Sequence, residues 1–448
     1  MFNKYDAYKD SGIDWVGKIP ASWGVKRLKA PLAERNEKND PIKTDFILSL
    51  TMHQGVIPQS EKTGGGNKPK EDLTAYKLAR PNDIVLNSMN VIVGSVGLSK
   101  YFGVVSPVYY MLYARDGSKT NIGYYNYIFQ SQAFQKNLGR LGTGILIKKS
   151  ETSGKLNTIR MKISMDDLNN ELLPIPSFNE QNKIVDFLDR KTAEIDQAIG
   201  IKEQQIALLN ERKQIVIQKA VTQGLNPNVA MKDSGVEWIG QIPEHWEISK
   251  IRYLGTTQNG ISAGGDYFGT GYPFVSYSDV YKNRVLPECV EGLAKSTLND
   301  QKSFSVQEGD IFFTRTSETI DEIGFTSVCY KTIENAVFAG FLIRFRPFLK
   351  APLIKEFSKY YFSSPMMRAY FVKEMNLVIR ASLSQELLKN LDVLLPNVEE
   401  QKAIAEYLDD LTGKIENAVL IKYSEIEKLK EYKNTLINDA VTGKIKVA

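Results

Sequence analysis

The strongest constraint on the fold is an internal repeat, because a chain that carries one segment twice contains one structural unit twice. Residues 10–23 read DSGIDWVGKIPASW and residues 233–246 read DSGVEWIGQIPEHW, at an offset of 223. A second pair of matching blocks runs from Ile159 to residue 222 and from Ile379 to residue 442, at an offset of 220. The 448-residue chain is therefore a tandem duplication, with units near 1–222 and 223–448.

Between the matching blocks, the two units keep similar lengths but lose most of their identity. These middle parts are rich in Gly, Tyr, Phe, Val, Ile and Thr in short runs with turn signals, which favours mixed β structure. The clearest remaining echo is Asp83-Ile-Val-Leu against Asp310-Ile-Phe-Phe. We expect an α+β fold, in which a mixed α/β domain followed by a long helix occurs twice.

Each unit ends in a segment of about 40 residues without proline, which predicts a helix roughly 60 Å long. Pro176 and Pro396 precede these helices, and Gly224 and Gly443 close them, which is the usual punctuation of helix ends. In chain order, the predicted domain, helix, domain and helix are 1–175, 176–224, 225–395 and 396–448.

Apolar residues at alternating spacings of three and four form a stripe on each predicted helix. At the offset of 220, eight of ten stripe positions are identical, including two lysines, so the stripe is interpreted as a heptad seam. Either each seam covers its own domain, or the two helices pack together; a 60 Å helix outreaches a domain with a radius of gyration of roughly 15 Å, which favours the second interpretation. The seam residues are Leu188, Ile195, Ile199, Ile206, Leu209, Leu408, Ile415, Val419, Ile426 and Leu429.

Composition and motifs point away from chemistry within this chain. The net charge of +5 and the pI near 8.7 are compatible with a polyanionic partner such as nucleic acid. The chain has no phosphate-binding loop, and with only His53, His245 and two cysteines we expect no catalytic residue and no metal site. No apolar run of about 20 residues and no secretory signal is present, which places the protein in the cytoplasm.

Two variable domains, each preceded by Trp-x4-Pro-x2-Trp and followed by a long helix opened by Pro-x4-Gln, resemble the specificity subunit of type I restriction-modification systems. The most specific marks are Pro176-Ser-Phe-Asn-Glu-Gln181 and Pro396-Asn-Val-Glu-Glu-Gln401, and the resemblance covers essentially the whole chain. It implies that the variable domains read the two halves of an asymmetric bipartite site in double-stranded DNA. It further implies that the helices set the separation of the domains and help to bind two methyltransferase subunits, and that a motor-nuclease subunit joins the assembly.

The resemblance also implies a division of labour, in which this chain is non-catalytic and binds no cofactor. S-adenosylmethionine, ATP and Mg would be bound by the partner subunits. Two domains that meet equivalent grooves of a duplex are related by its dyad, which predicts antiparallel helices. Two other functions stay open: a duplicated protein-binding adaptor that uses the helices as a scaffold, and a self-sufficient nuclease or methyltransferase.

Bases are read by Arg, Lys, Asn and Gln, and phosphates are held by these residues and by Ser and Thr, so loop residues of the variable domains are the candidates for DNA contact. Arg160 and Arg380 occupy the same place in both units, where a phosphate contact and a structural ion pair are equally open. The lysine-rich residues 62–70 have no counterpart in the second unit, so we expect the two half-sites to differ. The full set of candidates is His53, Gln54, Lys68, Lys70, Asn87, Asn90, Arg160, Tyr277, Ser278, Thr314, Arg315 and Arg380.

Overall fold

The chain folds into two compact units, each with its own domain and its own part of two long helices. The structure is a computed structural model that describes residues 3–51, 54–63, 69–89, 95–145, 160–316, 322–375 and 382–447. Unit 1 comprises residues 1–202 and 424–448, and unit 2 comprises residues 203–423. Because this division passes through both long helices, α4 (Phe178–Gln223) and α11 (Val398–Val441), the four consecutive segments predicted from the sequence stay a prediction.

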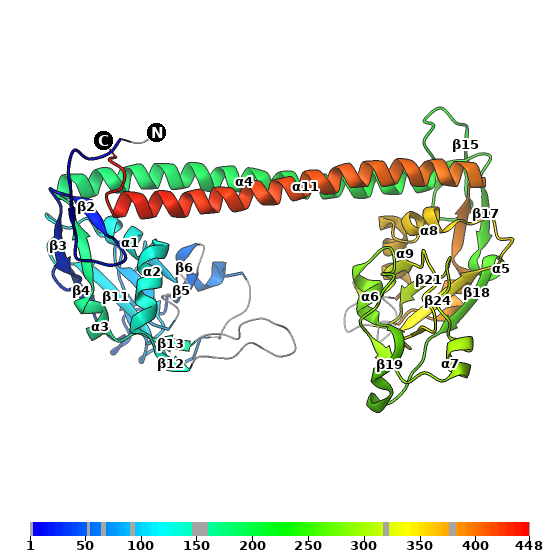
Figure 1. The fold of residues 1–448 in the computed structure, drawn as a ribbon, viewed down its shortest axis with the longest axis horizontal. Coiled ribbons are helices and arrows are strands. Elements are labelled where there is room, and N and C mark those ends of the chain that lie inside the picture. Colours follow the sequence, from blue (N-terminus) through cyan, green and yellow to red (C-terminus); the bar gives the residue numbers. More distant parts are fainter. Residues whose placement is uncertain are drawn as a thin grey trace. The chain divides into compact units, whose positions relative to one another are not determined.

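The centre of each unit is a four-stranded antiparallel sheet (Figure 1). In unit 1 the strand order is β4-β11-β8-β9, and in unit 2 it is β18-β24-β21-β22. The strands of the first sheet are Leu32–Arg35, Tyr109–Ala114, Ile84–Asn87 and Val96–Leu98, and those of the second are Gly255–Asn259, Leu342–Pro347, Ile311–Thr314 and Thr326–Val328. The two sheets share one strand order, which confirms the predicted duplication and the mixed α+β fold.

Both faces of each sheet are covered. Along β21, Ile311 and Phe313 point into the main core of unit 2, which the helices complete. The residue between them, Phe312, points into a second core on the opposite face, beside Phe338. This alternation follows from the two-residue period of a strand. It recurs in β8 of unit 1, so a continuous run of apolar residues is buried on both sides.

A buried aspartate stands in front of the central strand of each unit and explains the Asp-Ile echo in the sequence. Asp83 is 1% exposed and accepts hydrogen bonds from Nε of Arg35 at 2.9 Å and from its Nη2 at 3.2 Å. Asp310 is 0% exposed and binds Arg346 in the same two-pronged manner, at 2.6 Å for both bonds. The strand that supplies the arginine differs, since Arg35 lies on β4 and Arg346 on β24. The two acids therefore have one structural role, which is to tie the start of a central strand to another strand of its sheet: β4, two places away, in unit 1 and the neighbouring β24 in unit 2.

The units also share three smaller helices and two small sheets that connect each domain to the long helices. The helices are α1 (Ile122–Gln130), α2 (Gln132–Leu138) and α3 (Met165–Asn170) in unit 1, and α8 (Lys355–Tyr361), α9 (Pro365–Met375) and α10 (Gln385–Asn390) in unit 2. The paired strands are β3 (Gly24–Arg27) with β14 (Leu172–Ile175) and β1 (Tyr8–Asp10) with β2 (Lys18–Pro20) in unit 1, and β17 (Glu247–Lys250) with β25 (Asp392–Leu395) and β15 (Met231–Asp233) with β16 (Gln241–Pro243) in unit 2.

The units differ in what is added to this common frame. Unit 1 adds three two-stranded ladders: β5 (Leu48–Thr51) with β6 (Gly55–Pro58), β7 (Lys77–Ala79) with β10 (Gly103–Val105), and β12 (Thr143–Ile145) with β13 (Arg160–Lys162). Unit 2 adds a three-stranded sheet and short helices: β19 (Phe268–Val275) between β20 (Leu293–Ala294) and β23 (Val337–Phe338), with α5 (Ile251–Leu254), α6 (Tyr277–Lys282) and α7 (Leu298–Ser303). The variable parts of the sequence are therefore also the variable parts of the fold.

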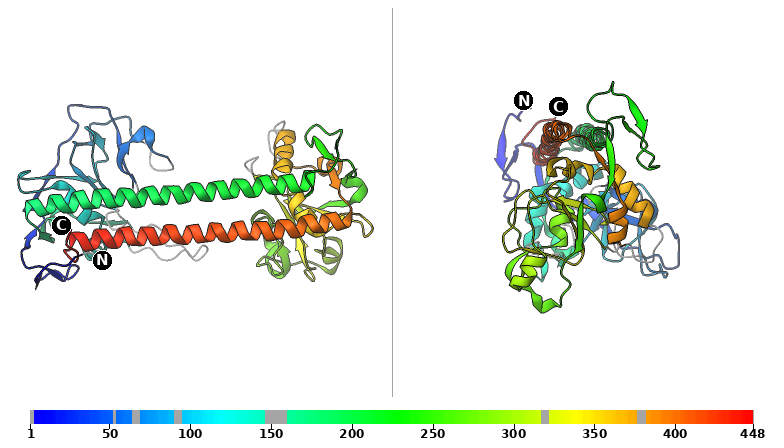
Figure 2. Two further views of the ribbon diagram at one scale, coloured as in Figure 1. Left: turned by 90° about the horizontal axis from the view of Figure 1, so that it is seen from above. Right: turned by 90° about the vertical axis from the view of Figure 1, so that its right-hand side faces the viewer.

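Within each unit the α4 and α11 segments lie side by side and run in opposite directions (Figure 2). In unit 1, Lys433 is bound to Asp196 at 2.6 Å and Lys202 to Glu425 at 2.6 Å, so residue numbers rise on one helix as they fall on the other. In unit 2, Lys213 is bound to Glu416 at 3.2 Å. These pairs confirm the predicted antiparallel packing. They also explain the seam lysines, because their amines reach acids of the opposite helix and so help to fix the register.

The seam predicted from the sequence is the buried side of both helices. All ten predicted seam residues are buried or half-buried, with Leu188 and Leu408 fully covered at 0% exposure. Apolar residues outside the seam are exposed instead, for example Leu208 at 63% and Leu420 at 64%. Burial therefore follows the heptad register and not hydrophobicity alone.

The repeated tryptophan of each unit packs against the end of the helix that belongs to the other repeat. Trp23 lies beside Gly443 after α11, and Trp246 lies beside Gly224 after α4. Both glycines adopt positive φ angles, +73° for Gly443 and +72° for Gly224, as residues that close helices often do. The second tryptophan of the frame Trp-x4-Pro-x2-Trp thus packs against the end of a long helix.

We predict that Gly443→Ala lowers the free energy of unfolding by roughly 1–3 kcal/mol, because a side chain there is strained by the positive φ angle. A Cβ at this position would also lie only 2.3 Å from Cδ of Pro20. Gly413 is the matched control, since it lies inside α11 with nothing within 4 Å of an added Cβ. Gly413→Ala should stabilise the protein by about 1 kcal/mol. Thermal unfolding of both variants checks the opposite signs.

Candidate nucleic-acid interface

In unit 1, two of the predicted DNA-contact residues, Gln54 and Lys70, lie in loops and are exposed. Gln54 lies in the turn between β5 and β6, where its backbone N–H donates to Oγ1 of Thr51 at 3.0 Å. Lys70 is exposed, and its backbone N–H donates to the hydroxyl of Tyr76 at 3.1 Å. At both positions the backbone is fixed by a hydrogen bond and the residue is exposed to solvent. His53 and Lys68 lie outside the described residues.

Asn87 ends β8 and is half-buried, with its side-chain oxygen accepting a hydrogen bond from the backbone of Met89 at 3.0 Å. This contact turns the chain at the end of the central strand, so the described role of Asn87 is structural. Asn90 and Arg380 lie outside the described residues. Arg160 begins β13, and its side chain is outside what the structure describes, so the choice between a phosphate contact and an ion pair stays open for both arginines.

In unit 2, Tyr277 and Ser278 form the first turn of α6. Ser276 caps this helix and forms a reciprocal capping box with Asp279, which explains why the chain turns into a helix here. The hydroxyl of Tyr277 donates to the backbone carbonyl of Glu322 at 2.7 Å, whereas Ser278 is exposed. Of the two, Ser278 has the side chain that solvent reaches.

The prediction that Thr314 contacts DNA is wrong, because this residue is 0% exposed and does not reach the surface. Its hydroxyl donates to the carbonyl of Glu322 at 3.0 Å and accepts from the backbone N–H of Phe325 at 2.9 Å. Thr314 therefore holds together the two ends of the loop after β21. The sequence placed it correctly at a strand end, but the returning loop covers it.

Arg315 follows directly and is half-buried at the same strand end. Its backbone N–H donates to the carbonyl of Phe341 at 2.8 Å, and its carbonyl accepts from Leu383 at 2.8 Å. Among the described residues, no acceptor lies within hydrogen-bond distance of its buried Nε. The backbone of Arg315 is thus held at the strand end, and its half-buried side chain stays a candidate for DNA contact.

Two glutamines that the sequence marked only as part of a motif join each domain to its long helix. Gln181 is 1% exposed; its side-chain oxygen accepts from the backbone of Asn121 at 2.9 Å, and its amide donates to the carbonyl of Pro176 at 3.1 Å. Gln401 repeats this pattern, with the backbone of Ile354 at 3.0 Å and the carbonyl of Pro396 at 2.8 Å. A buried amide that is satisfied on both sides fixes the direction in which the helix leaves the domain.

A tyrosine in each domain strengthens this junction about two turns further along the helix. The hydroxyl of Tyr127 donates to Asp189 on α4 at 2.5 Å, and that of Tyr360 donates to Asp409 on α11 at 2.6 Å. Burial, followed by the neighbouring carboxylate, raises the pKa of both phenols above their ordinary value, so the hydroxyls stay protonated as donors. Because Asp189 and Asp409 are related by the offset of 220, the repeat itself could have identified this contact.

No group of three or more His, Cys, Asp or Glu side chains that could hold a metal ion occurs within the described ranges. The helices in the same ranges include none that is both long enough and apolar enough to span a membrane.

Comparison with known proteins finds similar sequences of one kind. The model of the type I restriction modification DNA specificity domain matches residues 243–428. The EcoKI specificity subunit of Escherichia coli strain K12 is 29% identical over 436 residues, which cover 90% of this chain and 86% of that protein. The MjaVIII specificity subunit of Methanocaldococcus jannaschii is 28% identical over 280 residues; the match covers 61% of this chain and 62% of that relative's length.

Solved structures show the same fold at low sequence identity. A chain from a structural study of complex assembly and conformational transition of the type I restriction-modification system has a TM-score of 0.67 at 15% identity, covering 94% of this chain and 98% of that one. The HsdS subunit from Thermoanaerobacter tengcongensis has a TM-score of 0.52 at 15% identity, covering 95% and 98%. By the domain match, the two related proteins and the duplicated fold together, this chain is similar to type I restriction-modification DNA specificity subunits.

Proposed function

We propose that this chain is the non-catalytic, cytoplasmic subunit that selects the DNA sequence on which a type I restriction-modification complex acts. Each domain reads one half of an asymmetric bipartite target in double-stranded DNA. The observation that carries this proposal is a common frame with different additions. Both units share one sheet order and one glutamine junction, yet unit 1 adds two-stranded ladders such as β5–β6 and unit 2 adds a three-stranded sheet. A shared frame that carries different surface elements suits two domains that bind different half-sites.

The long helices are proposed to hold the domains in register and to dock two methyltransferase subunits. In unit 2, large apolar side chains on these helices are exposed, namely Leu208, Ile215, Leu420 and Ile421, at 63%, 58%, 64% and 58%. Large apolar side chains that stay exposed outside the seam suit a surface that another protein covers. Motor-nuclease subunits would join this assembly.

The chemistry is proposed to belong to those partners. S-adenosylmethionine would be bound by the methyltransferase subunits, and ATP with Mg by the motor-nuclease subunits, so this chain would need no cofactor of its own. Its contribution is positional, because it decides which adenines the methyltransferases reach.

We predict that a host expressing this chain with its methyltransferase partner gains one bipartite methylated adenine motif, detectable by methylome sequencing. Exchanging residues 255–375 for those of a relative should change only one half of the motif, because unit 2 reads one half-site. A methylome without a new bipartite motif, although both subunits are present and associated, would contradict the proposal.

A duplicated adaptor that binds only proteins is the competing function, and DNA binding separates the two. The reconstituted complex should bind its target at least about 10³-fold more tightly than unrelated duplex at physiological salt. An adaptor would show weak binding that falls steeply with salt and does not depend on sequence.

A further inference from the structure

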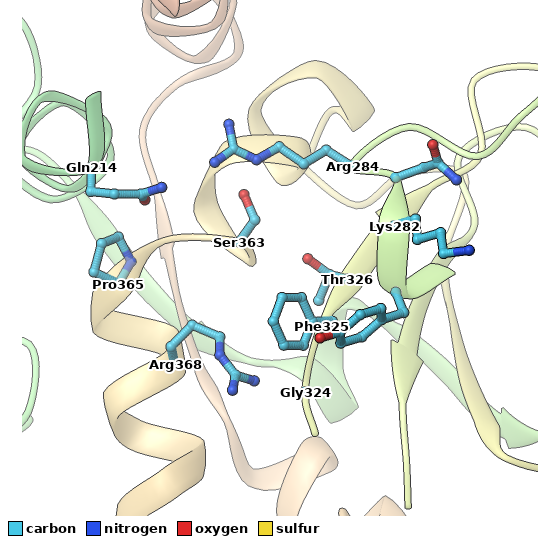
Figure 3. Close-up of a pocket in the computed structure, with 11 residues that line it drawn as sticks. Gln214, Lys282, Arg284, Gly324, Phe325, Thr326, Ser363, Pro365 and Arg368 are labelled. Carbon is cyan, nitrogen blue, oxygen red and sulfur yellow. The ribbon is translucent and has the colours of Figure 1, made fainter. Parts of the chain in front are cut away.

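Unit 2 contains a cavity of about 490 Å³ that none of the predicted DNA-contact residues lines (Figure 3). Its walls come from Gln214 of α4, the end of α6, the start of β22 and the junction of α8 with α9. A volume of this size lies within the range of small-molecule sites, roughly 300–1,000 Å³. A lone inorganic ion would leave most of it unfilled.

The polar lining of the cavity is cationic. Lys282, Arg284 and Arg368 line it, and of the residues that the structure describes no Asp or Glu does. Figure 3 shows Arg284 and Arg368 entering from opposite sides, while the amine of Lys282 points away from them. Gln214 and Ser363 lie near Arg284 and add further hydrogen-bonding groups. The cavity therefore suits an anionic group with several acceptor oxygens.

Arg284 carries its charge in a desolvated place. Burial lowers the pKa of its guanidinium group, and electrostatic interactions with Tyr360 and Glu416 offset only part of this effect. Among the described residues, no carboxylate lies within ion-pair distance of Arg284. Because a buried cation without a paired anion is unfavourable, an anionic ligand would stabilise the site.

The second wall is aromatic. The guanidinium carbon of Arg368 lies 4.4 Å from the ring centre of Phe325, and that ring packs against Tyr281 at 4.7 Å between centres. A guanidinium stacked on a ring is fixed in orientation. An anion-binding side and an aromatic side thus share one cavity.

We propose that this cavity binds a nucleotide unit, with its phosphate at Arg284 and its base on the aromatic side, beside Tyr281 and Phe325. Base and phosphate together match the two chemistries and the volume of the cavity. The unit has two sources, a free nucleotide or a nucleotide unstacked from a DNA strand. The inference does not depend on the proposed bipartite target, since it concerns one cavity of unit 2.

Calorimetric titration of the full chain tests this site with three probes: 2′-deoxyadenosine 5′-monophosphate, deoxyadenosine and inorganic phosphate. The monophosphate should bind at least about tenfold more tightly than either part alone, because only it reaches both walls. Arg284→Gln should weaken its binding at least about tenfold, and Arg284→Lys should weaken it less, since the charge is kept.

Arg252→Gln is the matched control, because it removes the same charge from an arginine of unit 2 that is bound to Glu386 at 3.2 Å and does not line the cavity. Its binding should equal that of the unchanged chain, and thermal unfolding should show all variants folded. Competition by a short single-stranded oligodeoxynucleotide would assign the nucleotide unit to DNA; lack of competition would assign it to a free nucleotide. No binding of the monophosphate, equal binding of inorganic phosphate, or an equal loss in Arg252→Gln would overturn the proposal.

Discussion

Asp310→Ala is expected to lower the free energy of unfolding of unit 2 by about 3 kcal/mol. The carboxylate is 0% exposed and accepts three hydrogen bonds, two from Arg346 at 2.6 Å each and one from the backbone of Gln307 at 2.7 Å. Its removal leaves the Nε of Arg346 and a backbone N–H without an acceptor, while the Nη1 and Nη2 groups of Arg346 keep their bonds to Ser305. Because the side chain of Arg346 is 27% exposed, water solvates part of the orphaned charge, which places the effect at the lower end of the range for buried pairs.

Glu308→Ala provides the control for this change, two residues away and with the same loss of charge. The side chain of Glu308 is 57% exposed and pairs with Lys355 at the surface, so its loss should cost no more than about 1 kcal/mol. By calorimetry, Asp310→Ala should lower the unfolding midpoint of unit 2 by about 6–12 °C. Equal shifts for the two variants would show that the aspartate does not join the strands as the structure indicates.

The sequence predicted the duplicated architecture because both copies are preserved in one chain. Positions that stay identical at the offset of 220 include the seam residue Leu188 with Leu408, and both are fully buried. What it did not predict is that Trp23 seats the end of α11, a helix of the other repeat. That contact joins residues some 420 positions apart, and no local periodicity carries such information.

The candidate site was less predictable, because exposure in a loop depends on how the chain returns. Thr314 stands at a strand end, where the pattern indicated a reachable side chain, yet the backbone of Phe325 closes over it. The cavity residues Arg284 and Arg368 lie in the variable part of the chain, where the repeat gives no second copy to compare. Both line one cavity only because the chain packs the region around β22 close to α9, which composition and spacing do not specify.

The second large effect is expected from Ile206→Asp, which puts a charge into the seam between the long helices. Ile206 is 7% exposed, and a carboxylate there would lose much of its hydration. We expect the free energy of unfolding to fall by roughly 3–5 kcal/mol, the range of the most damaging single substitutions. Circular dichroism during heating should show an earlier loss of helical signal.

Leu208→Asp makes the same chemical change two residues along α4, where the side chain is 63% exposed. Its effect on unfolding should stay within about 0.5 kcal/mol, as for most surface substitutions. If the exposed apolar residues form the proposed docking surface, Leu208→Asp should instead weaken binding of the methyltransferase subunit at least about tenfold, measured by titration, because the new carboxylate would be buried against an apolar partner. The pair of variants thus separates the two roles of one helix: Ile206 acts on stability and Leu208 on assembly. A similar fall in stability for both would mean that the heptad register assigned to α4 is wrong.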